Sequence, residues 1–264
     1  MVAAFLRAAG IGSLAGALSG LVAGGIGGRV AMRIIAIVAG PDKVGVTTEN
    51  GSRVGDITVE GTVGLMLFGG VFAGILGGLA YEVVRPWFAS FGRWRELVFG
   101  LALLVALGSV IISPGNVDFR RFGSSALNVL LFALLFALYG VVLAPTEERL
   151  RRTVPDLPEA PRGIWATIVV AAVILALVPA GFMLVSGIVE LVSLARGPLD
   201  ASAIGPLLIV LVVLIVLALR WLLETREKTI RGRGGVRALG YAVLAAPIAV
   251  GAVESVRAIG TIFR

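Results

Sequence analysis

Long apolar runs separated by short polar stretches dominate the chain. A helix needs about 20 apolar residues to cross roughly 30 Å of hydrocarbon, because each residue rises about 1.5 Å and lipid offers no partner for free backbone groups. The pattern therefore predicts an all-α fold, a polytopic transmembrane helix bundle of about seven spans, with six to eight as the range. The predicted spans are Ala8 to Gly28, Leu65 to Val84, Leu97 to Ser113, Ser124 to Ala144, Ile164 to Leu194, Ile204 to Leu223 and Ala238 to Thr261.

The segments between these runs predict little additional structure. Within the loop from Gly40 to Gly61, apolar and polar residues alternate on both sides of Asn50-Gly51, which predicts a small extracytoplasmic β-hairpin. We expect a single integral membrane domain over residues 1–264. It divides into a glycine-rich four-helix part at 1–144, a proline-containing cytoplasmic linker at 145–163 and a three-helix part at 164–264.

Composition supports the membrane class and excludes several types of metal site and catalytic mechanism. Hydrophobic residues make up 58% of the chain and charged residues 15%, whereas about a quarter of a soluble protein is charged. The chain has no histidine and no cysteine, which excludes histidine-based zinc sites, cysteine-ligated iron–sulfur clusters and Ser-His or Cys-His catalysis within it. No phosphate-binding loop or HExxH motif occurs either. We expect a protein that is not an enzyme, with no catalytic residue, metal site or cofactor.

Positive charges predict the orientation and one class of partner. Most of the 23 lysines and arginines, and all four tryptophans, fall on the side of the N-terminus. Because these residues accumulate at the cytoplasmic face, we expect a bacterial-type inner membrane protein with a cytoplasmic N-terminus and an extracytoplasmic C-terminus. The net charge of +7 sits beside predicted spans, which favours anionic lipid headgroups of the bilayer over nucleic acid as the partner.

Glycines recur every fourth residue in the first two predicted spans. Residues four apart share a helix face, so this small-xxx-small spacing gives a shallow groove that another backbone can approach closely. Two interpretations remain open: the two spans pack on each other as an antiparallel pair, or one glycine face lines a homo-oligomer interface or a pore. The predicted helix-packing residues are Gly12, Gly16, Gly20, Gly24, Gly28, Gly70, Gly74 and Gly78.

A second set of residues places polar groups near or within the predicted spans. Arg29 and Arg33 follow the first span; either the helix ends at Gly28 and both reach the headgroups, or it continues and holds both at membrane depth. Asn128 fits interhelical hydrogen bonding as well as ligand binding. Glu254 has a local partner in Arg257. By the same reasoning, Glu82 with Arg85, and Glu147-Glu148 with their neighbouring arginines, are interpreted as helix-surface pairs.

Two functions are consistent with these patterns. In the first, the protein binds or passes a small solute or ion through an outer-facing polar vestibule. In the second, it is a non-catalytic accessory or structural subunit of a larger membrane complex, with homo-oligomers or other membrane subunits as partners. The residues predicted to line the vestibule are Arg29, Arg33, Glu60, Asn128 and Glu254.

Overall fold

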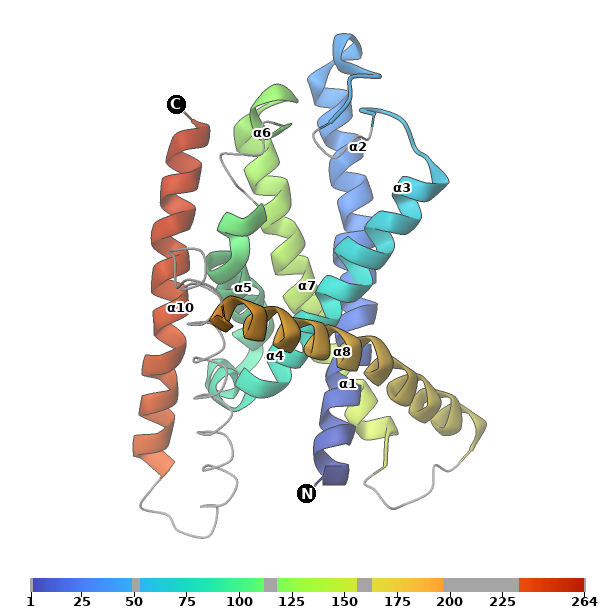
Figure 1. Ribbon diagram of the computed structural model, residues 1–264, viewed down its shortest axis with the longest axis vertical. Coiled ribbons are helices and arrows are strands. Elements are labelled where there is room, and N and C mark those ends of the chain that lie inside the picture. Colours follow the sequence, from blue (N-terminus) through green and yellow to red (C-terminus); the bar gives the residue numbers. More distant parts are fainter. Residues whose placement is uncertain (1, 49–52, 112–117, 156–162, 197–232, 264) are drawn as a thin grey trace.

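The computed structural model describes residues 2–48, 53–111, 118–155, 163–196 and 233–263, and nearly all of them are helical. Figure 1 shows long helices along the vertical axis, with the N-terminus at the bottom and the C-terminus at the top. We call these two ends of the bundle the lower end and the upper end. The predicted all-α fold class is confirmed.

The first helix is continuous from the lower end to the upper end. It consists of α1 (Val2–Gly20), the π-helical segment η1 (Leu21–Gly27) and α2 (Gly28–Ala39). It ends at Gly40, whose φ of 87° breaks the helical geometry, and the short 3-10 turn η2 (Pro41–Lys43) follows. The helix therefore does not end at Gly28.

The second helix returns to the lower end and then reverses. It contains α3 (Val59–Gly64), the π-helical segment η3 (Leu65–Phe72) and α4 (Ala73–Phe88). The 3-10 segment η4 (Ala89–Trp94) joins it to α5 (Arg95–Ile111). Gly92, with φ 54° and ψ −124°, is the non-helical residue at which the chain turns back.

The remaining helices complete the bundle. The short α6 (Asp118–Arg121) leads into α7 (Ser125–Thr153), which packs between α1 and α5. α7 continues through Pro145, so the first residues of the expected linker are helical. α8 (Ile164–Arg196) crosses α1 obliquely, and α10 (Arg233–Ile262) runs beside α5 (Figure 1).

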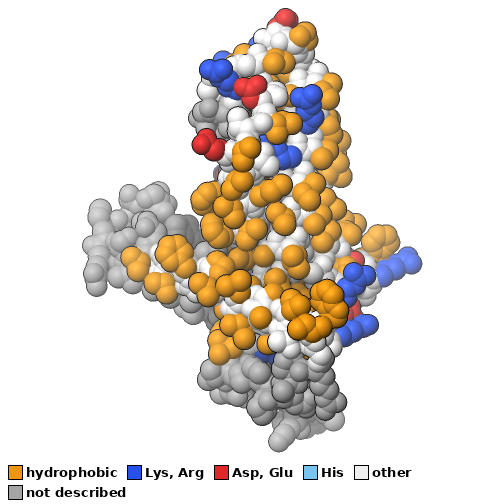
Figure 2. Space-filling view, turned by 90° about the vertical axis from the view of Figure 1, so that its right-hand side faces the viewer, with side chains coloured by type: hydrophobic (Ala, Val, Ile, Leu, Met, Phe, Trp, Pro, Cys, Tyr) orange, Lys and Arg blue, Asp and Glu red, His pale blue; other side chains and the backbone are white. Residues whose placement is uncertain are grey.

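Five helical segments of the described chain are long and apolar enough to cross a membrane. They are Phe5–Ala39, Val59–Gly108, Ser125–Thr153, Ile164–Phe182 and Ala238–Ile262. Figure 2 agrees with a membrane location, because apolar side chains cover the middle of the face it shows and charged ones gather toward its ends. Seven separate spans are not confirmed: the expected second and third spans belong to one helical run bent at Gly92, and the expected sixth, Ile204 to Leu223, lies outside the described residues.

The predicted β-hairpin is not confirmed. In the part of the loop that the structure describes, pairing is limited to one antiparallel bridge between Thr47 and Arg53, and no strand forms there. The amide of Val54 donates to the carbonyl of Val46 at 3.0 Å. The Thr58 side chain accepts from the Gly61 amide at 3.1 Å and caps α3, so the residues expected to extend the returning strand begin a helix instead. The expected turn residues 49–52 lie outside the described residues.

The first two helices meet backbone to backbone along their glycines. A methyl group added at Gly16 would collide with the carbonyl of Gly74, and one added at Gly20 would collide with the carbonyl of Gly70. Gly12 faces Gly78 in the same manner, and Gly24 faces Gly69 and Gly70. The two helices run antiparallel, and η1 lies against η3 within this contact. Gly28 differs from the other glycines of the series, because its neighbour is the side chain of Leu65.

Glycines also close two interfaces that the spacing did not predict. Gly140 of α7 lies against the backbone of Glu96 and Gly100 in α5, and Gly251 of α10 lies against the backbone of Val105 and Ala106. Neither glycine has another glycine four residues before or after it. Close packing through single small residues therefore extends from α1 across the bundle to α10.

Candidate functional site

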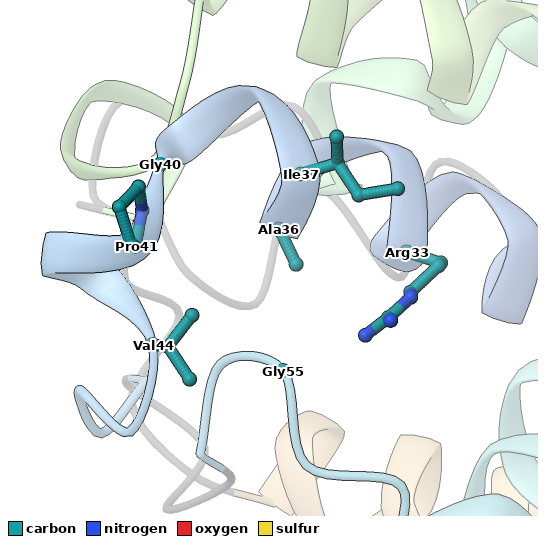
Figure 3. A pocket seen from close by; sticks show the side chains of 7 residues that line it. All are labelled: Arg33, Ala36, Ile37, Gly40, Pro41, Val44 and Gly55. Atoms are coloured by element: carbon teal, nitrogen blue, oxygen red, sulfur yellow. The ribbon is translucent and has the colours of Figure 1, made fainter.

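The upper end holds an open cavity of about 330 Å³ between α2, η2 and the following loop (Figure 3), and Arg33, Ile37, Pro41 and Val44 of its wall are exposed. Arg33 extends from α2 along this cavity toward the backbone at Gly55 (Figure 3). Two glycines in the left-handed region, Gly40 with φ 87° and Gly55 with φ 89°, allow the chain to fold over it. Its wall is formed by Arg33, Ala36, Ile37, Gly40, Pro41, Val44 and Gly55. Among the described residues of this wall, Arg33 is the one that carries a charge; the carboxylates of Asp42 and Asp56 come directly after the wall residues Pro41 and Gly55.

A small apolar cluster holds the wall of the cavity in place. Ala36, Val54 and Phe122 are buried together, with Ile35 among the residues packed against them. The cluster joins α2 to the loop after η2 and to the segment that follows α6. Burial of these side chains fixes the two cavity walls relative to each other without any contribution from Arg33.

Arg29 lies one turn before Arg33 and approaches the second helix. A methyl group added at Gly61 would lie 3.1 Å from Nη2 of Arg29, so the guanidinium group is beside the first turn of α3. Nε of Arg29 is buried and has no hydrogen-bond acceptor among the described residues. Glu60 is on the same turn of α3 but is exposed, and within the described chain it forms no ion pair with Arg29.

Asn128 and Glu254 occupy other environments. Asn128 is 2% exposed and donates from Nδ2 to the carbonyl of Phe122 at 2.8 Å, which ties the start of α7 to the apolar cluster behind the cavity. Glu254 is exposed on α10 and pairs with Arg257 at 3.0 Å. Of the five predicted vestibule residues, the cavity wall thus contains only Arg33. Arg29 is its neighbour on α2, and Asn128 contributes indirectly.

A buried ionic cluster at the lower end is the main feature that the sequence reasoning missed. Glu82 of α4 and Glu147 of α7 are 4% and 2% exposed. The guanidinium group of Arg151 contacts both carboxylates, and Nη1 of Arg85 lies 3.6 Å from Glu147. Two carboxylates from different helices therefore share one arginine. We call these four residues the ionic cluster.

The sequence contains a signal for this cluster. Glu82 comes four residues after Gly78, so it continues the glycine series and must face α1. A methyl group added at Gly12 would lie 2.6 Å from Cγ of Glu82, so a glycine at position 12 provides the space for the glutamate. Glu147 lies four residues after the buried Leu143 and four before Arg151. The spacing thus places Glu82 and Glu147 on buried helix faces. Their closeness in sequence to arginines had instead suggested ion pairs on the helix surface.

Arg7 attaches α1 to the same region. Its Nε donates to the carbonyls of Val154 and Pro155 at 3.2 and 3.0 Å, and its Nη2 donates to the carbonyl of Arg151 at 3.0 Å. These carbonyls belong to the end of α7, where the helix has no donors of its own to satisfy them. A cation at a helix C-terminus is also favoured by the helix dipole. The lower ends of α1, α4 and α7 are therefore joined by charged side chains.

The two regions offer different chemistry. The described wall of the upper cavity contains one arginine and no carboxylate, whereas the ionic cluster contains two glutamates and two arginines. Within the described residues, no group of three or more potential metal-ligating side chains occurs. No protein-family model matches this chain, and comparisons with curated proteins and with solved structures give no match.

Proposed function

We propose that this multi-pass membrane protein binds a small anionic solute at its upper end. The observation that carries the proposal is the position of Arg33, which lies in the wall of an open cavity of about 330 Å³ whose other described wall residues are uncharged. A guanidinium group without an opposing carboxylate attracts an anion, and its planar donors suit the two oxygens of a carboxylate or phosphate group.

Arg29 adds to the positive potential near the cavity. It lies one helical turn away on α2, and its guanidinium group approaches the first turn of α3 at Gly61. The solute class that fits is a small carboxylate or phosphate compound. Binding is favoured over passage between the first two helices, because backbone atoms of the facing glycines occupy that interface.

The charge of Arg33 is the part of the proposal most easily tested. We expect Arg33→Gln to weaken the binding of acetate or inorganic phosphate by roughly tenfold or more, because a charge-assisted hydrogen bond is lost. Arg33→Lys keeps the charge without the planar pair of donors and should give an intermediate affinity. Isothermal titration calorimetry of the full chain in detergent measures the anion affinity of the wild type, Arg33→Gln and Arg33→Lys.

The matched control is Arg257→Gln, which removes an exposed arginine of α10 that pairs with Glu254. It should leave anion affinity unchanged. Wild-type protein that binds neither anion, or equal affinities for wild type and Arg33→Gln, would refute the proposed function. Anion flux in vesicles then distinguishes binding alone from passage through the membrane.

The second candidate function, a non-catalytic subunit of a larger membrane complex, is favoured by α8. Val173 packs on Gly10 of α1, but Leu175, Val178 and Phe182 on the same oblique helix are exposed. Such a helix leaves apolar side chains available to a neighbouring subunit.

This candidate predicts that a partner chain purifies with the protein in a fixed ratio under mild detergent. The double substitution Leu175→Gln/Phe182→Gln should release that partner while the circular dichroism spectrum of the protein is retained. Retention of the partner by the variant, or purification of the wild type as a lone monomer, would exclude this function for α8.

A further inference from the structure

The turn between α4 and α5 presents aromatic and cationic side chains together at the lower end. All residues of η4 are exposed, including Phe91 at 44% and Trp94 at 56%. The guanidinium carbon of Arg93 lies 5.2 Å from the centre of the Trp94 ring. Both aromatic rings are thus accessible next to a cation at the point where two apolar helices meet. Side chains of this kind are typical of the headgroup level of a membrane.

A pair of arginines lies directly beside this turn. Nη2 of Arg95 is 2.8 Å from one oxygen of Glu148, and Nη2 of Arg152 is 2.7 Å from the other. One carboxylate shared by two guanidinium groups leaves a net positive charge. Arg152 is exposed and Arg95 is partly exposed, so both retain donors that can reach an outside acceptor.

Burial decides which glutamates can offset the charge of the exposed arginines at the lower end. Glu82 and Glu147 are buried with Arg151, so they do not neutralise the exposed arginines around the turn. Arg93 has no carboxylate partner in the described part of the chain, and its guanidinium group lies over the ring of Trp94. Glu96 follows Arg95 at the start of α5 and is partly exposed, so Glu96 and Glu148 offset two of the three charges of Arg93, Arg95 and Arg152, and the surface around the turn keeps a net positive charge.

We propose that this surface binds the headgroup of an anionic phospholipid. We call it the headgroup site, and it consists of Phe91, Arg93, Trp94, Arg95 and Arg152. The arginines would donate to the phosphate oxygens, the aromatic rings would lie at the glycerol level, and the acyl chains would follow the exposed apolar side of α5 at Leu101. A free phosphate ion could use only the arginines, so the adjoining aromatic and apolar surfaces favour a lipid.

Tryptophan quenching by brominated lipids tests this proposal in the full chain. The protein is reconstituted into phosphatidylcholine vesicles that contain a small fraction of brominated phosphatidylglycerol or, for comparison, brominated phosphatidylcholine. The contribution of Trp94 is the part of the quenching that Trp94→Phe removes. We expect Trp94 to be quenched more by the anionic lipid, and each of Arg93→Gln and Arg152→Gln to lower the preference for that lipid roughly fivefold.

The control is Arg257→Gln at the other end of the molecule, which should leave quenching of Trp94 unchanged. Circular dichroism establishes that each variant is folded. Equal quenching of Trp94 by the two brominated lipids would overturn the proposal, as would an unchanged preference in folded Arg93→Gln. Full reversal of the preference by millimolar inorganic phosphate would also overturn it and would identify a site for a free anion.

Discussion

Substitution of Gly20 by leucine is expected to prevent the first two helices from packing and to destabilise the fold by about 3 kcal/mol or more. Even a single methyl group at this position would collide with the carbonyl of Gly70 and approach Cα of Gly74 within 2.7 Å. The neighbouring atoms are backbone, which cannot rotate away, so the helices must separate. Thermal unfolding in detergent, followed by circular dichroism, measures the loss.

The smaller substitution Gly20→Ala adds only the methyl group, and Gly64→Ala is its matched control. Gly64 lies in the second helix, and no atom is within 4 Å of a methyl group added there. We expect Gly64→Ala to leave the unfolding temperature nearly unchanged and Gly20→Ala to lower it. Size-exclusion chromatography distinguishes this expectation from a role between protomers, because a purely oligomeric role would change the assembly size of Gly20→Ala without lowering its unfolding temperature.

Removal of the Arg151 guanidinium group should also cause a large loss of folding stability. Arg151→Met removes the guanidinium group that contacts both buried carboxylates, Glu82 and Glu147, and breaking a buried ion pair by removal of one partner costs about 3–5 kcal/mol. Chemical unfolding in detergent measures the change. Arg152→Met is the control on the next residue, and because Arg152 and its partner Glu148 are both exposed, it should have little effect on stability.

A compensating variant distinguishes the lost charge from lost packing. Glu82→Gln/Glu147→Gln/Arg151→Met removes both buried carboxylates together with the arginine and should recover most of the stability lost in Arg151→Met, because no unpaired charge remains at the two glutamate positions. Failure of this triple variant to recover stability would show that the arginine acts mainly through the packing of its side chain.

Together, the contacts divide the molecule into a tightly packed middle and two ends with different chemistry. The first two helices touch through backbone atoms from Gly12 to Gly24, and charged side chains join α1, α4 and α7 below this contact. The cavity at Arg33 lies above it. The proposed solute site and the proposed headgroup site are therefore at opposite ends of a continuous helical contact.

The sequence was most informative where one physical constraint dominates. Apolar length predicted the helices, because lipid leaves a spanning backbone no other way to satisfy its hydrogen bonds. It was less informative at helix ends, where Thr58 caps α3 and prevents the expected strand, and at Gly92, where the chain reverses within a helical run. Tryptophans show the same limit: the sequence assigned all of them to one side of the membrane, but Trp94 is exposed, whereas Trp87 is buried beneath Gly240 of α10.

By itself, the sequence determined the all-helical class, the long apolar helices that fit a membrane location, and the faces on which the glycines repeat. Tertiary structure decided which polar residues meet. It separated Glu254 and Glu60 from the cavity at Arg33, and it brought Glu82 and Glu147 together around Arg151. The physical reason is that helix periodicity depends on residues a few positions apart, whereas an ion pair between helices depends on how distant segments are rotated and placed against each other.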